Sequence, residues 1–277
     1  MRRASYVIAA TAFLVAGIAF SNIRVVQSAE VIPVPDRLKE AGKIRFCTAP
    51  PYPPVIYQEG DQIMGSDADI GEAIGDKLGV DVEWVVIGFD GFIAAVQGDK
   101  CDGYLGASTH TEERAKQVHF TDYVDVGAQY LVRAGNPLGI HSESAEDLSG
   151  HAVSVLVGTT EKQSLDELNT KLQAEGKPLI DIQVFNADTD AGMALIQEKV
   201  DAYGSDSPGL TFYLSKFPDQ VELALPEPIR TKPWGIATRL NDTELHAALQ
   251  ATIDALYADG TMLQILEKWN LPDIALK

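Results

Sequence analysis

The sequence predicts an α/β protein made of two similar lobes, each built on a parallel β-sheet. Residues 100–104 read Lys-Cys-Asp-Gly-Tyr, and residues 199–203 read Lys-Val-Asp-Ala-Tyr. A spacing of about 100 residues is too long for the unit of a solenoid, so the repeat indicates two related lobes. Around each copy the order strand, helix, strand, helix, strand is expected, which is typical of a parallel sheet with crossover helices.

In the first half of the chain, glycines mark the ends of the expected helices. Gly42 and Gly79 each follow an amphipathic segment and suit the left-handed conformation that ends a helix. Gly60-Asp61 indicates a hairpin turn, and the proline-rich segment 49–54 indicates a rigid loop. The expected helices are 36–41, 69–78 and 90–97, and the expected strands are 44–47, 82–87 and 101–105.

The same order restarts after Gly150. The expected strands are 152–157, 182–185 and 200–203, and the expected helices are 160–174, 188–198, 207–215, 242–258 and 262–269. Two extended, β-favouring runs, 126–133 and 233–238, connect the halves. Two crossings allow the C-terminal helices to return to the first lobe. Two lobes joined by two strands form a hinge that can close on a ligand.

Composition excludes several classes of function. The 277 residues carry a net charge of −18, which argues against binding to nucleic acid or to anionic lipid. The five histidines show no metal-binding spacing, and the chain has no Walker loop, dinucleotide fingerprint or Gly-x-Ser-x-Gly elbow. We therefore expect no metal, no cofactor and no catalytic residues.

The N-terminus has the pattern of a secretory signal peptide. Arg2 and Arg3 precede the apolar run 7–20, which is short for a transmembrane span. Cleavage could follow Ala19-Phe20-Ser21 or fall near Ser28, and residues 1–28 are taken as the signal. An uncleaved membrane anchor is the alternative. A cleaved signal would mean that the mature protein is exported.

The chain has two cysteines, Cys47 and Cys101, both in expected strands of the first lobe. If these strands are parallel neighbours, the two Cα atoms would lie beyond the roughly 7 Å limit for a disulfide. The expectation is therefore two buried, unpaired thiols, although export would permit a bridge.

Polar loops beyond the strand ends provide candidate ligand residues, because ligands of open α/β sheets bind there. Arg114 lies one turn into a helix that opens over 109–113, and its guanidinium could bind a carboxylate. The alternative is an exposed arginine paired with Glu112 or Glu113. Asp206 could accept hydrogen bonds from an ammonium group, or it could cap a helix.

The remaining candidates are hydroxyl and aromatic residues. Thr159 and Thr160 open a helix in the second lobe, where they could contact a ligand or serve only as caps. Tyr52, between prolines, and Phe89 could form apolar walls, or they could belong to the core.

Motifs along nearly the whole mature chain follow the order found in one protein family. They are Tyr-Pro-Pro at 52–54, Gly-Ser-Asp-Ala-Asp-Ile at 65–70, Phe-Asp-Gly-Phe-Ile at 89–93, Lys-Cys-Asp at 100–102, Thr-His-Thr-Glu-Glu-Arg-Ala at 109–115, Phe-Thr-Asp at 120–122, Val-Gly-Thr-Thr at 157–160, Val-Asp-Ala at 200–202, Ser-Asp-Ser-Pro at 205–208, Asp-Gly-Thr at 259–261 and Glu-Lys-Trp at 267–269. With these motifs the chain resembles the family 3 extracellular solute-binding proteins, the periplasmic receptors of polar amino-acid ABC importers.

The resemblance implies a type II periplasmic-binding-protein fold, with lobe 1 formed by 31–126 plus 236–277 and lobe 2 by 127–235. It implies a monomer that binds a small solute and delivers it to an inner-membrane ABC permease. Its implied roles are α-carboxylate binding by Arg114 with help from Thr109, Thr159 and Thr160, α-ammonium binding by Asp206, and a ligand sandwich between Tyr52 and Phe89.

The chain departs from the family pattern in the first lobe. Ala49 stands where an aspartate is common, Ser66 where phenylalanine is usual, and Gly106 and Ala107 where hydroxyl residues are frequent. The departures disfavour a basic side chain on the ligand and leave neutral, acidic or non-amino-acid solutes. Alternative functions are a periplasmic enzyme similar to cyclohexadienyl dehydratases, which share this fold, and an accessory or sensory binding protein.

Overall fold

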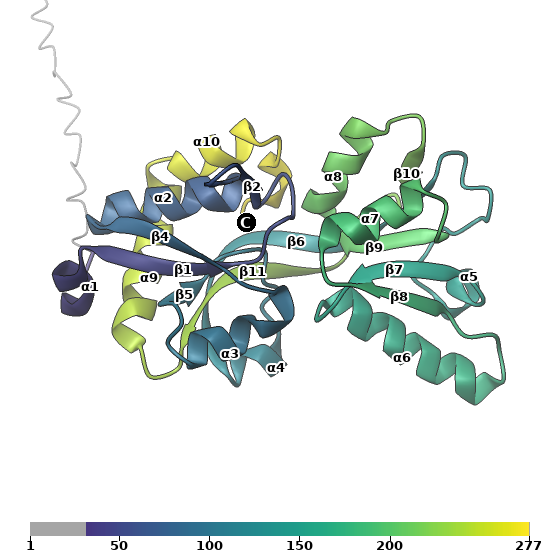
Figure 1. Cartoon of the computed structure of the whole chain (residues 1–277), viewed down its shortest axis with the longest axis horizontal. Coiled ribbons are helices and arrows are strands. Elements are labelled where there is room, and N and C mark those ends of the chain that lie inside the picture. The colour runs from purple at the N-terminus through teal and green to yellow at the C-terminus, as the bar shows by residue number, and fades with distance from the viewer. Residues whose placement is uncertain (1–31, 277) are drawn as a thin grey trace, which may run out of the picture. The chain divides into compact units, whose positions relative to one another are not determined.

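The computed structural model describes residues 32–276, which form two α/β lobes (Figure 1). The expected signal segment, 1–28, lies outside the described residues. One mixed sheet serves both lobes in the order β4-β1-β5-β11-β6-β9-β7-β8, with β10 paired to β6. The strands β6 (Val118–Arg133) and β11 (Ile229–Arg239) pair antiparallel and run through both lobes. They form the two-strand hinge that the sequence predicts.

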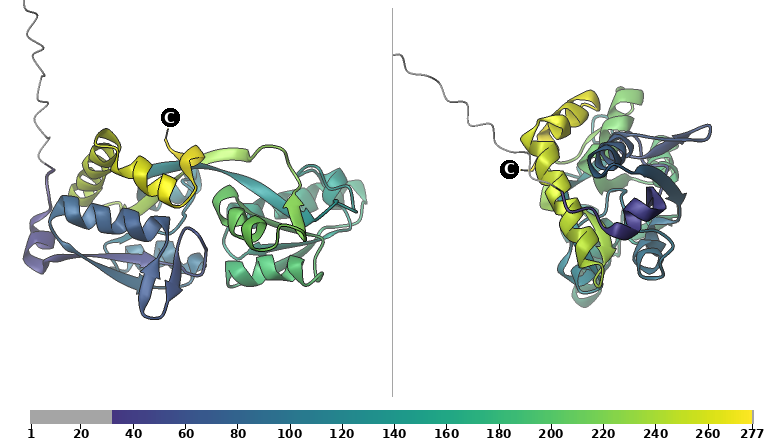
Figure 2. Two further views of the ribbon diagram at one scale, coloured as in Figure 1. Left: turned by 90° about the horizontal axis from the view of Figure 1, so that it is seen from above. Right: turned by 90° about the vertical axis from the view of Figure 1, so that its left-hand side faces the viewer.

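Lobe 1 contains the parallel strands β4 (Asp81–Val86), β1 (Lys43–Thr48) and β5 (Gly103–Tyr104). One hydrophobic core packs α2 (Ser66–Leu78), α9 (Thr243–Ala258) and α10 (Thr261–Lys268) on one face of this sheet, and a second core packs α3 (Phe92–Gln97) on the other. Figure 2 shows the C-terminal helices lying against this lobe, as two hinge crossings require. Its smaller elements are α1 (Asp36–Ala41), the hairpin β2 (Tyr57–Glu59) and β3 (Gln62–Met64), the 3-10 helices η1 (Phe89–Gly91) and η2 (Pro272–Ile274), and α4 (Glu112–Ala115).

Lobe 2 repeats this plan. Its parallel strands are β9 (Ala202–Asp206), β7 (Ala152–Leu156) and β8 (Asp181–Phe185). The helices α7 (Asp188–Ile196) and α8 (Ser207–Lys216) pack on one face, and α6 (Thr160–Glu175) packs on the other. Two elements were absent from the sequence prediction, the short helix α5 (Ala145–Leu148) and the strand β10 (Val221–Leu223).

The repeated aspartates make the same contact in each lobe. Asp102 accepts the backbone N–H of Arg45 through Oδ2 at 2.8 Å, and its own N–H donates to the carbonyl of Arg45 at 2.8 Å. Asp201 accepts the N–H of Ala152 at 3.0 Å and donates to its carbonyl at 2.7 Å. Each aspartate therefore joins the residues before its strand to the neighbouring parallel strand, and the repeat serves sheet pairing.

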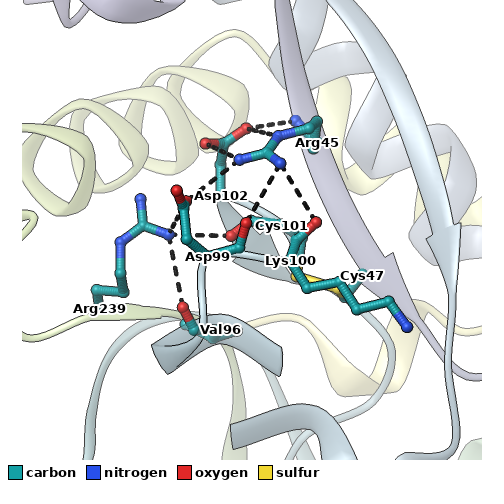
Figure 3. The surroundings of a disulfide bond; sticks show 8 residues. All are labelled: Arg45, Cys47, Val96, Asp99, Lys100, Cys101, Asp102 and Arg239. Carbon is teal, nitrogen blue, oxygen red and sulfur yellow. Dashed lines mark hydrogen bonds and ion pairs between the residues drawn. A yellow bond between two sulfur atoms is a disulfide. The ribbon is translucent and has the colours of Figure 1, made fainter. Parts of the chain in front are cut away.

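Cys47 and Cys101 form a disulfide, so the expectation of unpaired thiols is wrong (Figure 3). Their Cα atoms lie 5.6 Å apart. The expectation assumed that Cys101 continues a strand, but β5 contains only Gly103 and Tyr104. Cys47 pairs with Tyr104 in the ladder, and the chain bends at Cys101, which brings the two sulfur atoms together.

Charged side chains surround this disulfide (Figure 3). Three arginines and three aspartates alternate in a closed ring of ion pairs, in the order Arg37, Asp102, Arg45, Asp99, Arg239, Asp242 and back to Arg37. Burial alone would raise the pKa of Asp102, but the hydrogen bonds and charge of Arg45 outweigh it and lower the pKa. The ring ties α1, β1, β11 and the beginning of α9 together at the base of lobe 1.

Removing the disulfide with the double substitution Cys47→Ala and Cys101→Ala should lower the free energy of unfolding by about 2–4 kcal/mol. The bridge spans 54 residues, and its loss restores chain entropy to the unfolded state. Urea unfolding of the oxidised protein, the reduced protein and the double variant measures the effect. Reductant should leave the variant unchanged, and equal midpoints for all three samples would contradict a stabilising bridge.

Candidate functional site

A cavity lies where the carboxyl ends of the parallel strands and the first turns of the following helices meet. Residues of both lobes line it: Ala49, Tyr52, Phe89, Gly106, Ala107, Thr109, Arg114, Leu156, Thr159, Thr160, Glu161, Asp188, Gly204, Ser205 and Asp206. All seven ligand residues predicted from the sequence are among them. The structure therefore brings these residues together, whereas their contacts with a ligand stay a prediction.

Arg114 reaches across the cavity from lobe 1. Its Nη1 donates to the carbonyl of Thr109 at 2.8 Å, and its Nη2 donates to the carbonyl of Gly158 in lobe 2 at 2.9 Å. The guanidinium carbon lies 5.6 Å from the ring centroid of Phe89 and 5.3 Å from that of Phe92, within cation–π range. The guanidinium is thus oriented by backbone and aromatic groups, and no described ion pair joins it to Glu112 or Glu113.

Asp206 faces Arg114 from the second lobe. It occupies the N-cap position of α8, yet its side chain makes no capping hydrogen bond. Instead, its Oδ2 accepts the indole N–H of Trp234 on β11 at 3.0 Å. Burial and the charge of Glu161 raise the pKa of Asp206 well above its usual range. An ammonium group bound here would donate the hydrogen bonds that water gives to an exposed carboxylate.

The threonines are partly engaged by the protein itself. The Thr159 hydroxyl accepts the backbone N–H of Lys162 at 3.3 Å as the N-cap of α6, and it donates to the carbonyl of Leu156 at 2.8 Å. Thr109 is buried and forms an isolated β-bridge with Trp234. Capping and ligand contact are compatible, because the helix start still presents backbone N–H groups to the cavity.

Two aromatic side chains form the apolar walls. Tyr52 packs edge-on against Trp234, with ring centroids 6.1 Å apart, and its hydroxyl donates to the carbonyl of Asp206 at 3.3 Å. A Cβ atom at position 209 of α8 would lie 2.2 Å from Tyr52 Cε2, so Gly209 is what admits the ring. Phe89 packs on the aromatic core of lobe 1 beside Arg114.

Sequence reasoning missed two carboxyl groups of the cavity, Glu161 and Asp188. Glu161 is 3% exposed in the first turn of α6, and burial raises its pKa. Asp188 opens α7 and accepts the hydroxyl of Tyr203 at 2.6 Å, and burial raises its pKa to about 7. Acids in a first helical turn are common, because the helix dipole favours them there. The sequence therefore gave no reason to place these two acids in the cavity.

A buried aspartate outside the cavity supports the loop that contains Ala107. Asp67 in α2 accepts the backbone N–H of Ala107 at 2.9 Å and the hydroxyl of Tyr123 at 2.9 Å. Burial outweighs these hydrogen bonds and raises the pKa of Asp67 to about 7. From outside the cavity, the carboxyl group of Asp67 thus fixes the backbone of the loop that contains Ala107.

The sequence of this chain matches a known protein family. Residues 44–272 match the family model of bacterial extracellular solute-binding proteins, family 3. The chain belongs to this family. Within it, the L-arginine-binding protein of Pseudomonas aeruginosa is 32% identical over 80% of this chain and 86% of its own length. The L-cystine-binding protein TcyJ of Escherichia coli K12 is 26% identical over 86% of each chain.

Solved structures of solute-binding proteins agree with the fold. An ancestral arginine-binding protein bound to arginine has a TM-score of 0.74 and 32% identity, covering 82% of this chain and 98% of that one. The ancestral amino acid-binding protein AncCDT-1, described as a precursor of cyclohexadienyl dehydratase, has a TM-score of 0.74 and 31% identity, covering 84% and 97%. The type II periplasmic-binding-protein fold expected from the sequence is confirmed, and the chain is a solute-binding protein.

Residues 32–276 contain neither a membrane-spanning helix nor a cluster of metal ligands. No helix in this part of the chain is long and apolar enough to span a bilayer. Within the same residues, no group of three or more His, Cys, Asp or Glu side chains is arranged to hold a metal ion.

Replacing Asp67 with asparagine should remove a pH dependence of stability. An acid whose folded pKa is about 7 binds more protons in the folded state than in the unfolded state, where its pKa is about 4. It therefore destabilises the fold progressively as the pH rises from about 4 to about 7. Urea unfolding across this range should show wild type losing stability relative to Asp67→Asn.

The matched control for this test is Asp76→Asn, which removes an exposed carboxylate from the same helix. Its stability should run parallel to that of wild type at every pH. A constant difference between wild type and Asp67→Asn across the range would show that folding does not raise the pKa of Asp67.

Proposed function

We propose that the chain captures an amino acid or a related small carboxylate in the cavity between its lobes. One observation carries the proposal: a half-buried guanidinium and a half-buried carboxylate from opposite lobes, Arg114 and Asp206, line the same small cavity. This pair complements a zwitterion, since Arg114 can hold a carboxylate through two N–H groups and Asp206 can accept from an ammonium.

The other cavity residues have supporting roles in this proposal. Thr109, Thr159 and Thr160 assist in binding the carboxylate, and the α6 N-terminus adds a favourable dipole. Tyr52 and Phe89 enclose the apolar part of the ligand. Contacts from Arg114 to Gly158 and from Tyr52 to Asp206 already join the lobes, which is the arrangement that hinge closure around a ligand would need.

Membership of the family supports a proposal for the cellular context. We infer that residues 1–28 direct export, that the mature protein is a periplasmic monomer with lobes 31–126 plus 236–277 and 127–235, and that it delivers its ligand to an inner-membrane ABC permease. Relatives named as arginine- and cystine-binding proteins support an amino acid as the solute.

A thermal-shift screen of amino acids and small carboxylates should raise the melting temperature of wild type for its ligand, because binding at 100 times Kd adds about 2.7 kcal/mol of stability. Arg114→Ala should abolish the shift for every carboxylate. Asp206→Ala should abolish it only for ligands that carry an amine. The loss of one charge-assisted hydrogen-bonding partner costs about 2–5 kcal/mol when the other partner is left buried.

Matched controls separate the site from a general change of charge. Lys116→Ala removes an exposed cation just after α4, and Asp219→Ala removes an exposed anion after α8. Both should respond to ligand as wild type does. Undiminished ligand binding by Arg114→Ala would overturn the assignment of the site, and a screen without any shift would overturn the amino-acid proposal.

Catalysis is the second candidate function, and Glu161 is the observation that favours it. A dehydratase needs a proton-donating group in its cavity, and a buried carboxyl with a raised pKa is such a group. The proposal of a binding protein predicts that prephenate and arogenate are not converted. Ultraviolet detection of phenylpyruvate or phenylalanine formation tests this, and turnover that Glu161→Gln abolishes would establish an enzyme.

A further inference from the structure

Two carboxyl groups from different elements of lobe 2 line the cavity. Glu161 comes from the first turn of α6 and is 3% exposed, and Asp206 comes from the end of β9. Both line the cavity, and the charge of Glu161 is among the causes that raise the pKa of Asp206. The two groups are therefore close enough to repel one another when both are ionised.

Two neighbouring side chains contact the carboxyl group of Glu161. The Thr160 hydroxyl donates to its Oε1 at 3.0 Å, and Nη2 of Arg230 lies 3.7 Å from the same oxygen. Arg230 stands on the hinge strand β11 and also pairs with the buried Glu143. Because Arg230 is shared between two buried carboxylates, it neutralises Glu161 only in part.

The charges around the cavity do not balance. The carboxyl groups of Glu161, Asp188 and Asp206 line it, whereas Arg114 is the cationic side chain among its lining residues. A ligand carboxylate that binds Arg114 would take up the positive charge that offsets these acids. The remaining groups then favour a ligand with positive charge, and they disfavour the acidic solutes that the first-lobe departures left open.

We propose that Glu161 is a second receptor for the amino group of the ligand beside Asp206, so that the cavity selects solutes with an ammonium group and releases a proton when it captures one. The inference rests on the proposed function and deepens it. An ammonium has three N–H donors, which two carboxylates can share. Asp206 alone would satisfy an α-ammonium less completely, and a solute without an amine would leave both acids unpaired.

The proton balance is simple. In the empty cavity the pair holds one proton, because two carboxyl groups that line one small cavity do not both ionise readily. Capture of R–NH₃⁺ supplies a full positive charge, both carboxyls become ionised, and the shared proton leaves to solvent. The raised pKa values of both acids agree with this. The titratable and charged groups that face the pair are Arg114 on α4, Asp188 on α7, Arg230 on β11 and Tyr52 after β1.

Calorimetric titration with L-arginine and L-glutamine, in buffers of different ionisation enthalpy at a pH of about 7, counts the released protons directly. Wild type should release a proton, up to about one per ligand, when an amino acid binds. Glu161→Gln should bind at least about tenfold more weakly and release almost none. Glu167→Gln is the matched control, since it makes the same change on the exposed face of α6 and should match wild type.

Analogues without the α-amino group separate the two receptors from the rest of the cavity. 5-Guanidinopentanoate and glutaramate should bind wild type and Glu161→Gln equally and release no proton. If wild type binds an amino acid without proton release, or if Glu161→Gln binds it with wild-type affinity and proton count, the inference fails while the proposed function stands. If wild type binds neither the screened amino acids nor these probes, the proposed function itself fails.

Discussion

The antiparallel pairing of β6 with β11 is the constraint on which the rest of the structure depends. These strands belong to both lobes, and the remaining strands of the large sheet extend outward from them, β5, β1 and β4 on one side and β9, β7 and β8 on the other. Trp234 on β11 shows the consequence for the site. Its indole N–H binds Asp206, its ring packs against Tyr52, and its backbone bridges to Thr109. Trp234 therefore connects the hinge to cavity residues of both lobes, Tyr52 and Thr109 in lobe 1 and Asp206 in lobe 2.

A second theme is the burial of acids around the cavity. Asp67 and Asp188 occupy equivalent places, in the first turn of a helix beside the sheet, and each accepts a hydrogen bond from a buried tyrosine. Burial dominates the pKa of each, and each pKa rises to about 7. The lobes thus share an internal design as well as a topology. The lobes differ in the acids that line the cavity, because Glu161, Asp188 and Asp206 all come from lobe 2.

Much of the fold could be predicted from periodicity and helix-ending residues. Most helices and strands were placed within a few residues, since glycine stops and apolar faces are local signals. The disulfide could not be predicted correctly, because it depends on a bend at Cys101 that replaces an expected strand. The strand β10 was missed because its three residues are too few to show a hydrophobic periodicity. It forms by pairing with β6, which is distant in sequence. The ring of ion pairs joins residues from distant segments and has no sequence signature.

The sequence by itself determined the two-lobed α/β fold, the family and seven candidate residues that the structure places around one cavity. These follow from local patterns and from motifs in a fixed order. Only the tertiary structure decided which charged groups line that cavity and that its acids outnumber its cations. Glu161 and Asp188 look like ordinary first-turn acids in sequence, and their role depends on which groups face them across space. Electrostatic interactions depend on distance and burial, and neither can be read along a chain.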